Sequence, residues 1–187
     1  MYEKDNSAHR SENVYAMEPL TDSPFRLRHE IFVLDAHLKQ PLSPMERKQH
    51  AQKFIDDTLH ILKMEPLGFM QFHDAVDDRA PGWSFIQTIT TSHVSAHYFE
   101  KPGKHPHIRI DFYSCQSVNW RKVVEMSHRF CDLADWNATF ISREIGEDTG
   151  RQVLDIQGDG DRVVSENKLM EPKTAHMTES AFAPAAV

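Results

Sequence analysis

The sequence has few cysteines, little excess positive charge and no long apolar run, and each shortage excludes a class of protein. Only two of its 187 residues are cysteines, and no Cys-x-x-Cys pair occurs, so neither a disulfide framework nor a zinc ribbon is expected. The formal net charge of -7 argues against binding to nucleic acid or to an anionic membrane. No window approaches the length of a membrane span, and the charged N-terminus does not have the pattern of a signal peptide. We therefore expect a cytoplasmic protein.

Composition divides the chain into three segments. Residues 1–24 are polar and end in the breaker-rich sequence LTDSP, which predicts a flexible arm. Residues 25–145 carry most of the periodic apolar patterns and are long enough to bury one core. Residues 146–187 are polar, with scattered glycines and an Ala/Pro-rich end, which predicts a disordered tail.

The central segment predicts an α+β domain. Ser43 is placed as the N-cap of a long helix that starts at Pro44, and VNWRKVVEMSHRFCDLA (118–134) predicts a second, amphipathic helix. Strands are expected over residues 25–38, 66–76, 83–100 with a break near 90–92, 107–115 and 136–145. Helices that interrupt a mostly antiparallel sheet are typical of a two-layer sandwich with both helices on one face.

Reactive side chains are dense between residues 81 and 116, and each has an ordinary interpretation when taken alone. The serines there are typical of strands, and Cys115 alone would be a buried core cysteine. His93 and His97 form a His-x-x-x-His pair, which on a helix could bind zinc. They lie in strand-like sequence without an obvious third ligand, so we expect no metal site.

The spacing of these side chains resembles that of the bacterial-type S-adenosylmethionine decarboxylases over roughly residues 25–145. Members of that family have a Gly-x-Ser, a Ser-His pair eight residues later, a histidine five residues after the second serine, and then an Asp-x-(Phe/Tyr)-x-Cys. The matching residues are Gly82 and Ser84, Ser92 and His93, His97, and Asp111, Tyr113 and Cys115.

The resemblance implies an enzyme that cleaves itself and makes its own pyruvoyl cofactor. The Ser92 hydroxyl attacks the Thr91 carbonyl, the amide becomes an ester, and elimination splits the chain and leaves a pyruvoyl group made from Ser92. That carbonyl forms a Schiff base with the substrate amine and acts as the electron sink for loss of CO₂. Ser84 and His97 would assist processing, and Cys115 would protonate the decarboxylated carbon.

The resemblance also implies a homodimer with shared active sites. On a straight strand the step from Ser92 to His97 spans roughly 16 Å, and an odd number of residues places the two side chains on opposite faces. Family members combine the pyruvoyl group and the cysteine of one subunit with the processing serine and histidine of the other. We expect the same isologous arrangement here.

Two departures from the family pattern affect the chemistry. Thr91 stands where the family usually has the glutamate that precedes the serine. Asp78, beside Asp77, occupies the position of a phenylalanine that stacks on adenine, and its loss removes apolar contact area. Trp83, Phe85 or Phe99 could supply a ring instead.

These departures leave the substrate open. We expect Asp78 and Glu100 to contact the substrate, and carboxylates favour a guanidinium or ammonium group. S-adenosylmethionine, as a step in spermidine and hence polyamine biosynthesis, is the first expectation. Arginine or ornithine is the alternative substrate, and an uncleaved homologue without catalytic activity is the remaining interpretation.

Overall fold

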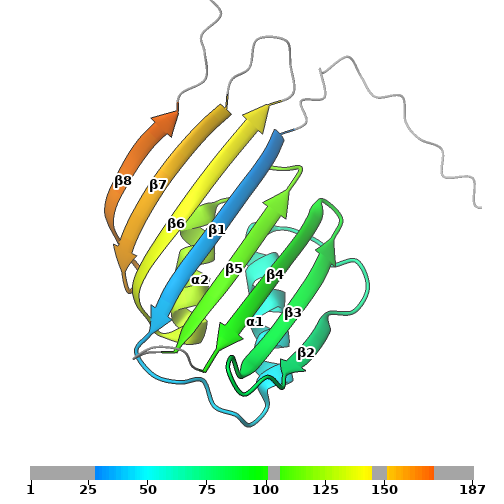
Figure 1. Ribbon diagram of the computed structural model, residues 1–187. Helices are drawn as coiled ribbons and strands as arrows, with labels where there is room; N and C mark the ends of the chain where they lie inside the picture. Colours follow the sequence, from blue (N-terminus) through cyan, green and yellow to red (C-terminus); the bar gives the residue numbers. More distant parts are fainter. Residues whose placement is uncertain (1–27, 101–105, 145–150, 171–187) are drawn as a thin grey trace, which may run out of the picture.

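The computed structural model describes residues 28–100, 106–144 and 151–170, which form one antiparallel sheet with two helices on one face (Figure 1). The strand order is β2-β3-β4-β5-β1-β6-β7-β8. The elements are β1 (Arg28–Leu38), α1 (Arg47–Leu62), β2 (Gln71–Ala75), β3 (Gly82–Ile89), β4 (Ser92–Phe99), β5 (His107–Ser114), α2 (Trp120–Cys131), β6 (Leu133–Glu144), β7 (Arg151–Asp159) and β8 (Arg162–Met170). This confirms the predicted two-layer α+β sandwich.

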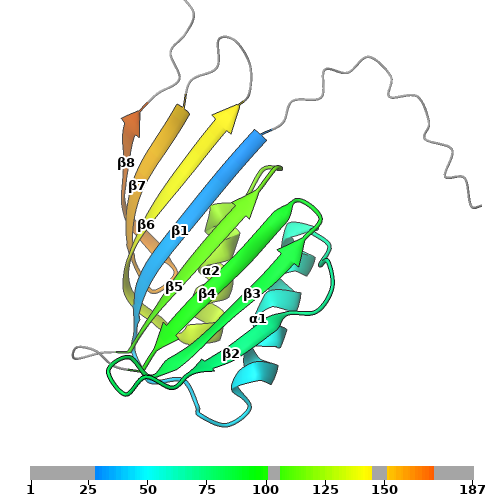
Figure 2. The same cartoon turned by 45° about the vertical axis from the view of Figure 1, so that its right-hand side comes forward.

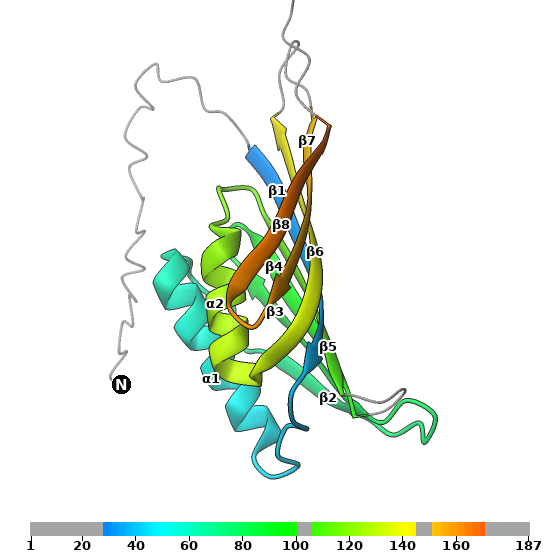
Figure 3. The same ribbon diagram turned by 90° about the vertical axis from the view of Figure 1, so that its left-hand side faces the viewer.

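The two faces of the sheet differ because its strands alternate apolar and polar residues. In β5, Ile108 and Ile110 are fully buried under the helices, while Arg109 and Asp111 lie on the opposite face. Such alternation is what a sheet covered on one side requires. Figure 3 shows both helices on one side of the sheet, and no described segment covers the other side. We call that second side the open face.

Helix α1 begins later than the sequence predicted. Ser43 is not its N-cap: the Ser43 hydroxyl accepts a hydrogen bond from the Met45 backbone N–H at 3.2 Å and so stabilises a turn before the helix. Glu46 then adopts a left-handed conformation with φ of 60°, and helical geometry starts at Arg47. A serine that bonds within its own turn competes with capping, which explains the error.

The prediction of a disordered tail is wrong for residues 151–170. These residues form the β7–β8 hairpin, which continues the sheet beyond β6 (Figure 2). Leu154 and Ile156 of β7 are buried, and the indole Nε1 of Trp136 donates a hydrogen bond to the carbonyl of Gly160 at 2.9 Å. The predicted arm, residues 1–24, and the rest of the predicted tail, 146–150 and 171–187, lie outside the described residues.

Gly158 makes the packing of this hairpin testable. A Cβ atom at Gly158 would lie 2.0 Å from Cζ2 of Trp136, which is itself buried. We expect Gly158→Ala to lower the free energy of unfolding by about 1–3 kcal/mol through overpacking, measured by urea denaturation. Gln157→Ala, at the exposed position beside it, should change stability by less than about 0.5 kcal/mol. Equal stabilities of the two variants would show that the hairpin does not pack on Trp136.

Candidate active site

Ser92 lies at the end of the tight turn that joins β3 to β4. Ile89 pairs with Ser92 across this hairpin, so Thr90 and Thr91 form the connection. Ser92 has a φ of 153°, in the positive range that residues with a side chain rarely adopt, and such backbone outliers cluster at functional sites. The strained residue therefore follows the peptide bond at which cleavage is predicted.

The carbonyl of Thr91 is held by the end of β5. Its oxygen accepts a hydrogen bond from the backbone N–H of Cys115 at 2.8 Å. The hydroxyl of Ser114, which is fully buried, donates to Thr91 Oγ1 at 3.1 Å and accepts from the N–H of Gln116 at 3.0 Å. An N–H aimed at a carbonyl oxygen stabilises the negative charge that develops there when a nucleophile attacks. The turn thus presents a polarised carbonyl directly before the Ser92 hydroxyl.

Three rings gather around Ser92 and Cys115. Ser92 Oγ lies 3.2 Å from His93 Nδ1, and the His93 ring meets the Tyr113 ring edge-on at 5.8 Å between centroids. Tyr113 Oη lies 2.6 Å from His29 Nδ1, and the same nitrogen is 3.9 Å from Cys115 Sγ. We call Ser92, His93, Tyr113, His29 and Cys115 the Ser92 cluster. The structure therefore brings the predicted pyruvoyl precursor and the predicted acid into one chain of contacts.

Ser84 and His97 form a second pair. Their residues are direct cross-strand neighbours on β3 and β4, and Ser84 Oγ lies 2.7 Å from His97 Nδ1. Strand β4 is continuous from Ser92 to Phe99, so the estimate of roughly 16 Å between Ser92 and His97 applies. Within one chain, the structure brings Ser84 to His97 and Ser92 to Cys115, but it does not bring the two pairs together.

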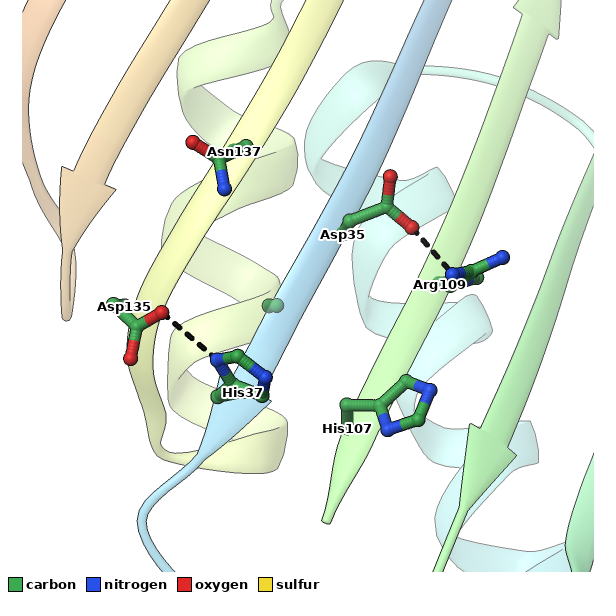
Figure 4. Close-up of a pocket in the computed structure, with 7 residues that line it drawn as sticks. Asp35, His37, His107, Arg109, Asp135 and Asn137 are labelled. Carbon is green, nitrogen blue, oxygen red and sulfur yellow. Dashed lines mark hydrogen bonds and ion pairs between the residues drawn. The ribbon is translucent and has the colours of Figure 1, made fainter. Parts of the chain in front are cut away.

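A cavity of about 250 Å³ opens on the open face, between side chains of β1, β5 and β6 (Figure 4). It lies next to the Ser84–His97 pair. The link is Arg109, which pairs with His97 across β4 and β5 and lines the cavity. Arg109 Nε lies 3.0 Å from Asp35 Oδ1, and His37 Nδ1 lies 2.8 Å from Asp135 Oδ1. The cavity therefore contains two carboxylates, each paired with a basic group.

The cavity ends at a pair of stacked rings. The ring centroids of Phe99 and His107 lie 4.7 Å apart, and His107 lines the cavity. Burial lowers the pKa of His107, and the nearby charges of Arg109 and His37 act in the same direction. Trp83 and Phe85 point into the core and are buried, so neither can stack on a ligand at the open face. Of the three rings proposed from the sequence, Phe99 remains.

The two predicted substrate-contacting acids lie at different places. Asp78 is exposed in the loop between β2 and β3, beside Asp77, which forms an ion pair with Arg79 at 2.7 Å. That ion pair lowers the pKa of Asp77. Glu100 follows β4 and accepts a hydrogen bond from Arg47 Nη2 at 2.5 Å. Neither acid joins the Ser92 cluster of its own chain.

His29 is the member of the Ser92 cluster that sequence reasoning missed. It lies at the start of β1, far from the motif residues in sequence. The antiparallel pairing of β1 with β5 brings it beside Tyr113, because Ile31 and Tyr113 are register partners. The sequence did predict the strand that contains His29, and alternation along that strand puts His29 on the face opposite the core. That pattern alone does not indicate a contact with Cys115.

The second cysteine of the chain, Cys131, lies in the core. Cys131 is buried, and burial raises the pKa of its thiol, as for a cysteine that packs in a core. Within residues 28–100, 106–144 and 151–170, no group of three or more His, Cys, Asp or Glu side chains is arranged to hold a metal ion. No helix in the same ranges is long and apolar enough to cross a membrane.

Together these features define a class of protein: an α+β sandwich whose open face carries a strained serine turn, a nearby thiol and a separate Ser–His pair. The family model described as S-adenosylmethionine decarboxylase matches residues 38–144, more than half of the chain. The chain belongs to the S-adenosylmethionine decarboxylase family, which implies a decarboxylase. The match includes Ser84, Ser92, His97 and Cys115 but not His29. A comparison with curated proteins gives no match.

Proposed function

We propose that the protein is a self-cleaving, pyruvoyl-dependent decarboxylase of polyamine biosynthesis, with S-adenosylmethionine as its substrate. The observation that carries the proposal is the geometry at the predicted cleavage site. The Thr91 carbonyl oxygen accepts a hydrogen bond from the Cys115 N–H at 2.8 Å, and Thr91 is followed by Ser92 with its strained backbone. A turn built in this way favours attack of the Ser92 hydroxyl on that carbonyl, because the developing charge already has a hydrogen-bond donor.

Cleavage then follows from the chain's own groups. Attack of Ser92 Oγ on the Thr91 carbonyl carbon forms a C–O bond, and the Thr91–Ser92 C–N bond breaks to give an ester. A base removes the α-hydrogen of Ser92, the ester C–O bond breaks, and the Thr91 carboxylate leaves. Addition of water and loss of ammonia convert the remaining unsaturated residue to a pyruvoyl group. In this scheme His97 is the base. Attack of the Ser92 hydroxyl first closes a five-membered ring, and Ser84 holds this cyclic intermediate before the C–N bond breaks.

The complete site requires two subunits. The rings of the Ser92 cluster lie on the open face at a different level from the Ser84–His97 pair, and Ser92 lies beside these rings at the end of the β3–β4 turn. We propose an isologous homodimer in which two open faces meet, so that the Ser92 cluster of one subunit lies against the Ser84–His97 pair of the other. The support for this arrangement is the separation of Ser92 from His97 within a chain and the uncovered face that carries His97 and the rings beside Ser92.

The substrate has to match the cavity beside the Ser84–His97 pair. The pyruvoyl group would supply a carbonyl that takes up the substrate amine and accepts the electrons of the breaking bond to CO₂, and Cys115 would supply the proton. A cationic group of the substrate would have to share Asp35 and Asp135 with Arg109 and His37, and S-adenosylmethionine, arginine and ornithine all have such a group. The Phe99–His107 rings favour a substrate with a flat base, which supports S-adenosylmethionine. The carboxylates keep arginine and ornithine as alternatives.

Release of labelled CO₂ from each of the three amino acids tests the substrate. We expect release from S-adenosylmethionine, and Phe99→Ala should raise its KM about tenfold through lost stacking of about 1.4 kcal/mol. Self-cleavage of Phe99→Ala at the normal rate is the control for folding. Release only from arginine or ornithine would establish the alternative substrate. No release from any of them by a cleaved protein would reject the decarboxylase, and an uncleaved protein would be the non-catalytic homologue.

A further inference from the structure

Cys115 has to regain a proton after each turnover in the proposed function, on which this inference rests. Its S–H bond breaks, and the proton goes to the substrate carbon that carries the electron pair left by departure of CO₂. A thiolate remains at a half-buried position of the open face. Water is a weak acid at neutral pH, so a positioned side chain with an exchangeable proton accelerates the return of the proton.

His29 is placed to supply that proton. Its Nδ1 lies 3.9 Å from Cys115 Sγ, and histidine is the side chain that ordinarily gains and loses a proton near neutral pH. The His29 ring also stacks on the Tyr113 ring at 5.8 Å between centroids, with Tyr113 Oη 2.6 Å from the same Nδ1. Two contacts from Tyr113 therefore fix the plane of the imidazole beside the sulfur.

The other charged and titratable groups around His29 come from three strands. His93 of β4 contacts the far side of Tyr113, and Arg143 of β6 is the register partner of His29, so a fixed positive charge lies on the same face. Glu30, the next residue of β1, points to the helix side, where its carboxylate accepts the Val118 N–H at 2.5 Å. Glu30, the acidic residue next to His29 in sequence, is therefore hydrogen-bonded on the opposite face of the sheet and does not face the imidazole.

We infer that His29 is a positioning residue that returns a proton to the Cys115 thiolate after each turnover. The N–H bond of the protonated imidazole breaks, the proton moves to Sγ, and the neutral ring recovers a proton from water. His29 acts through Cys115 and does not have to touch the substrate. Tyr113 keeps the imidazole in place between turnovers.

Alkylation of Cys115 in the uncleaved Ser92→Ala protein tests the contact without any catalytic turnover. Iodoacetamide should label Cys115 alone, because Cys131 is buried and its thiol pKa is raised; Cys115→Ser confirms this. His29→Gln should slow labelling at neutral pH about threefold to tenfold, since the Cys115 sulfur loses the ring nitrogen that lies beside it. His37→Gln is the matched control, because His37 lies on the same strand and the same face as His29 but outside the Ser92 cluster. It should leave the labelling rate of Cys115 unchanged.

Equal labelling rates for His29→Gln and His37→Gln in folded protein would overturn the inference. A second measurement follows the ring itself: labelling Cys115 should shift the NMR signals of the His29 imidazole, which are identified by their absence from the His29→Gln protein, and no shift would also overturn the inference. Both experiments use uncleaved protein. A failure here therefore contradicts the role of His29 alone, whereas the proposed function is tested separately by cleavage of the unmodified chain.

Discussion

Ser92→Ala is expected to leave the chain whole and to abolish decarboxylation. Alanine has no oxygen to attack the Thr91 carbonyl, so neither the ester nor the pyruvoyl group can form. Denaturing mass analysis should show one chain of 187 residues, and CO₂ release should fall to the uncatalysed level. The Cys115 N–H contact to Thr91 is made by the backbone and should persist in this variant.

Ser95→Ala is the matched control for this substitution. Ser95 lies on the same strand, β4, and pairs with Asp111 on the open face, but it belongs to neither the Ser92 cluster nor the Ser84–His97 pair. We expect it to cleave as the unmodified protein does. Cleavage of Ser92→Ala at the same bond would show that another residue is the nucleophile.

Mixing two inactive variants should restore cleavage if the site is shared between subunits. Ser92→Ala lacks the nucleophile, and His97→Ala lacks the processing base, so each homodimer should remain uncleaved or nearly so. In a mixed dimer, one of the two sites combines an intact Ser92 from the His97→Ala chain with an intact His97 from the Ser92→Ala chain. The expected result is cleavage of the His97→Ala chain in about half of the dimers after random exchange, measured by mass.

The presence or absence of cleavage in the mixture distinguishes a shared site from a site within one chain. Cleavage confined to the His97→Ala chain supports the shared site, because that chain alone carries Ser92. Absence of cleavage in a mixture shown to exchange subunits would mean that Ser92 and His97 act within one chain. A large bend of β4 would then be required, since its eight residues form one continuous strand here.

Local pattern was sufficient to predict much of the sheet. Alternation in β5 placed Ile108 and Ile110 in the core and Arg109 on the open face, as observed. The break near residues 90–92 placed the turn between β3 and β4 correctly. A two-residue turn puts residues equally distant from it opposite each other, so the Ser84–His97 contact follows from the position of that turn alone.

The errors arose where tertiary contacts decide the structure. Gly158 and Gly160 weaken the strand pattern of 151–170, yet they are the residues that allow Trp136 to pack against that hairpin. His29 reaches Cys115 only through the pairing of β1 with β5, and no local spacing predicts which strands become neighbours. These two features required the three-dimensional arrangement.

Denaturing mass analysis of the unmodified, purified protein tests the central claim most directly. The account predicts two fragments, residues 1–91 and 92–187, and the second should lack an ordinary amino terminus because Ser92 has become a pyruvoyl group. Reaction of that fragment with a carbonyl reagent such as hydroxylamine should add the corresponding mass. A single intact chain after prolonged incubation would contradict the account.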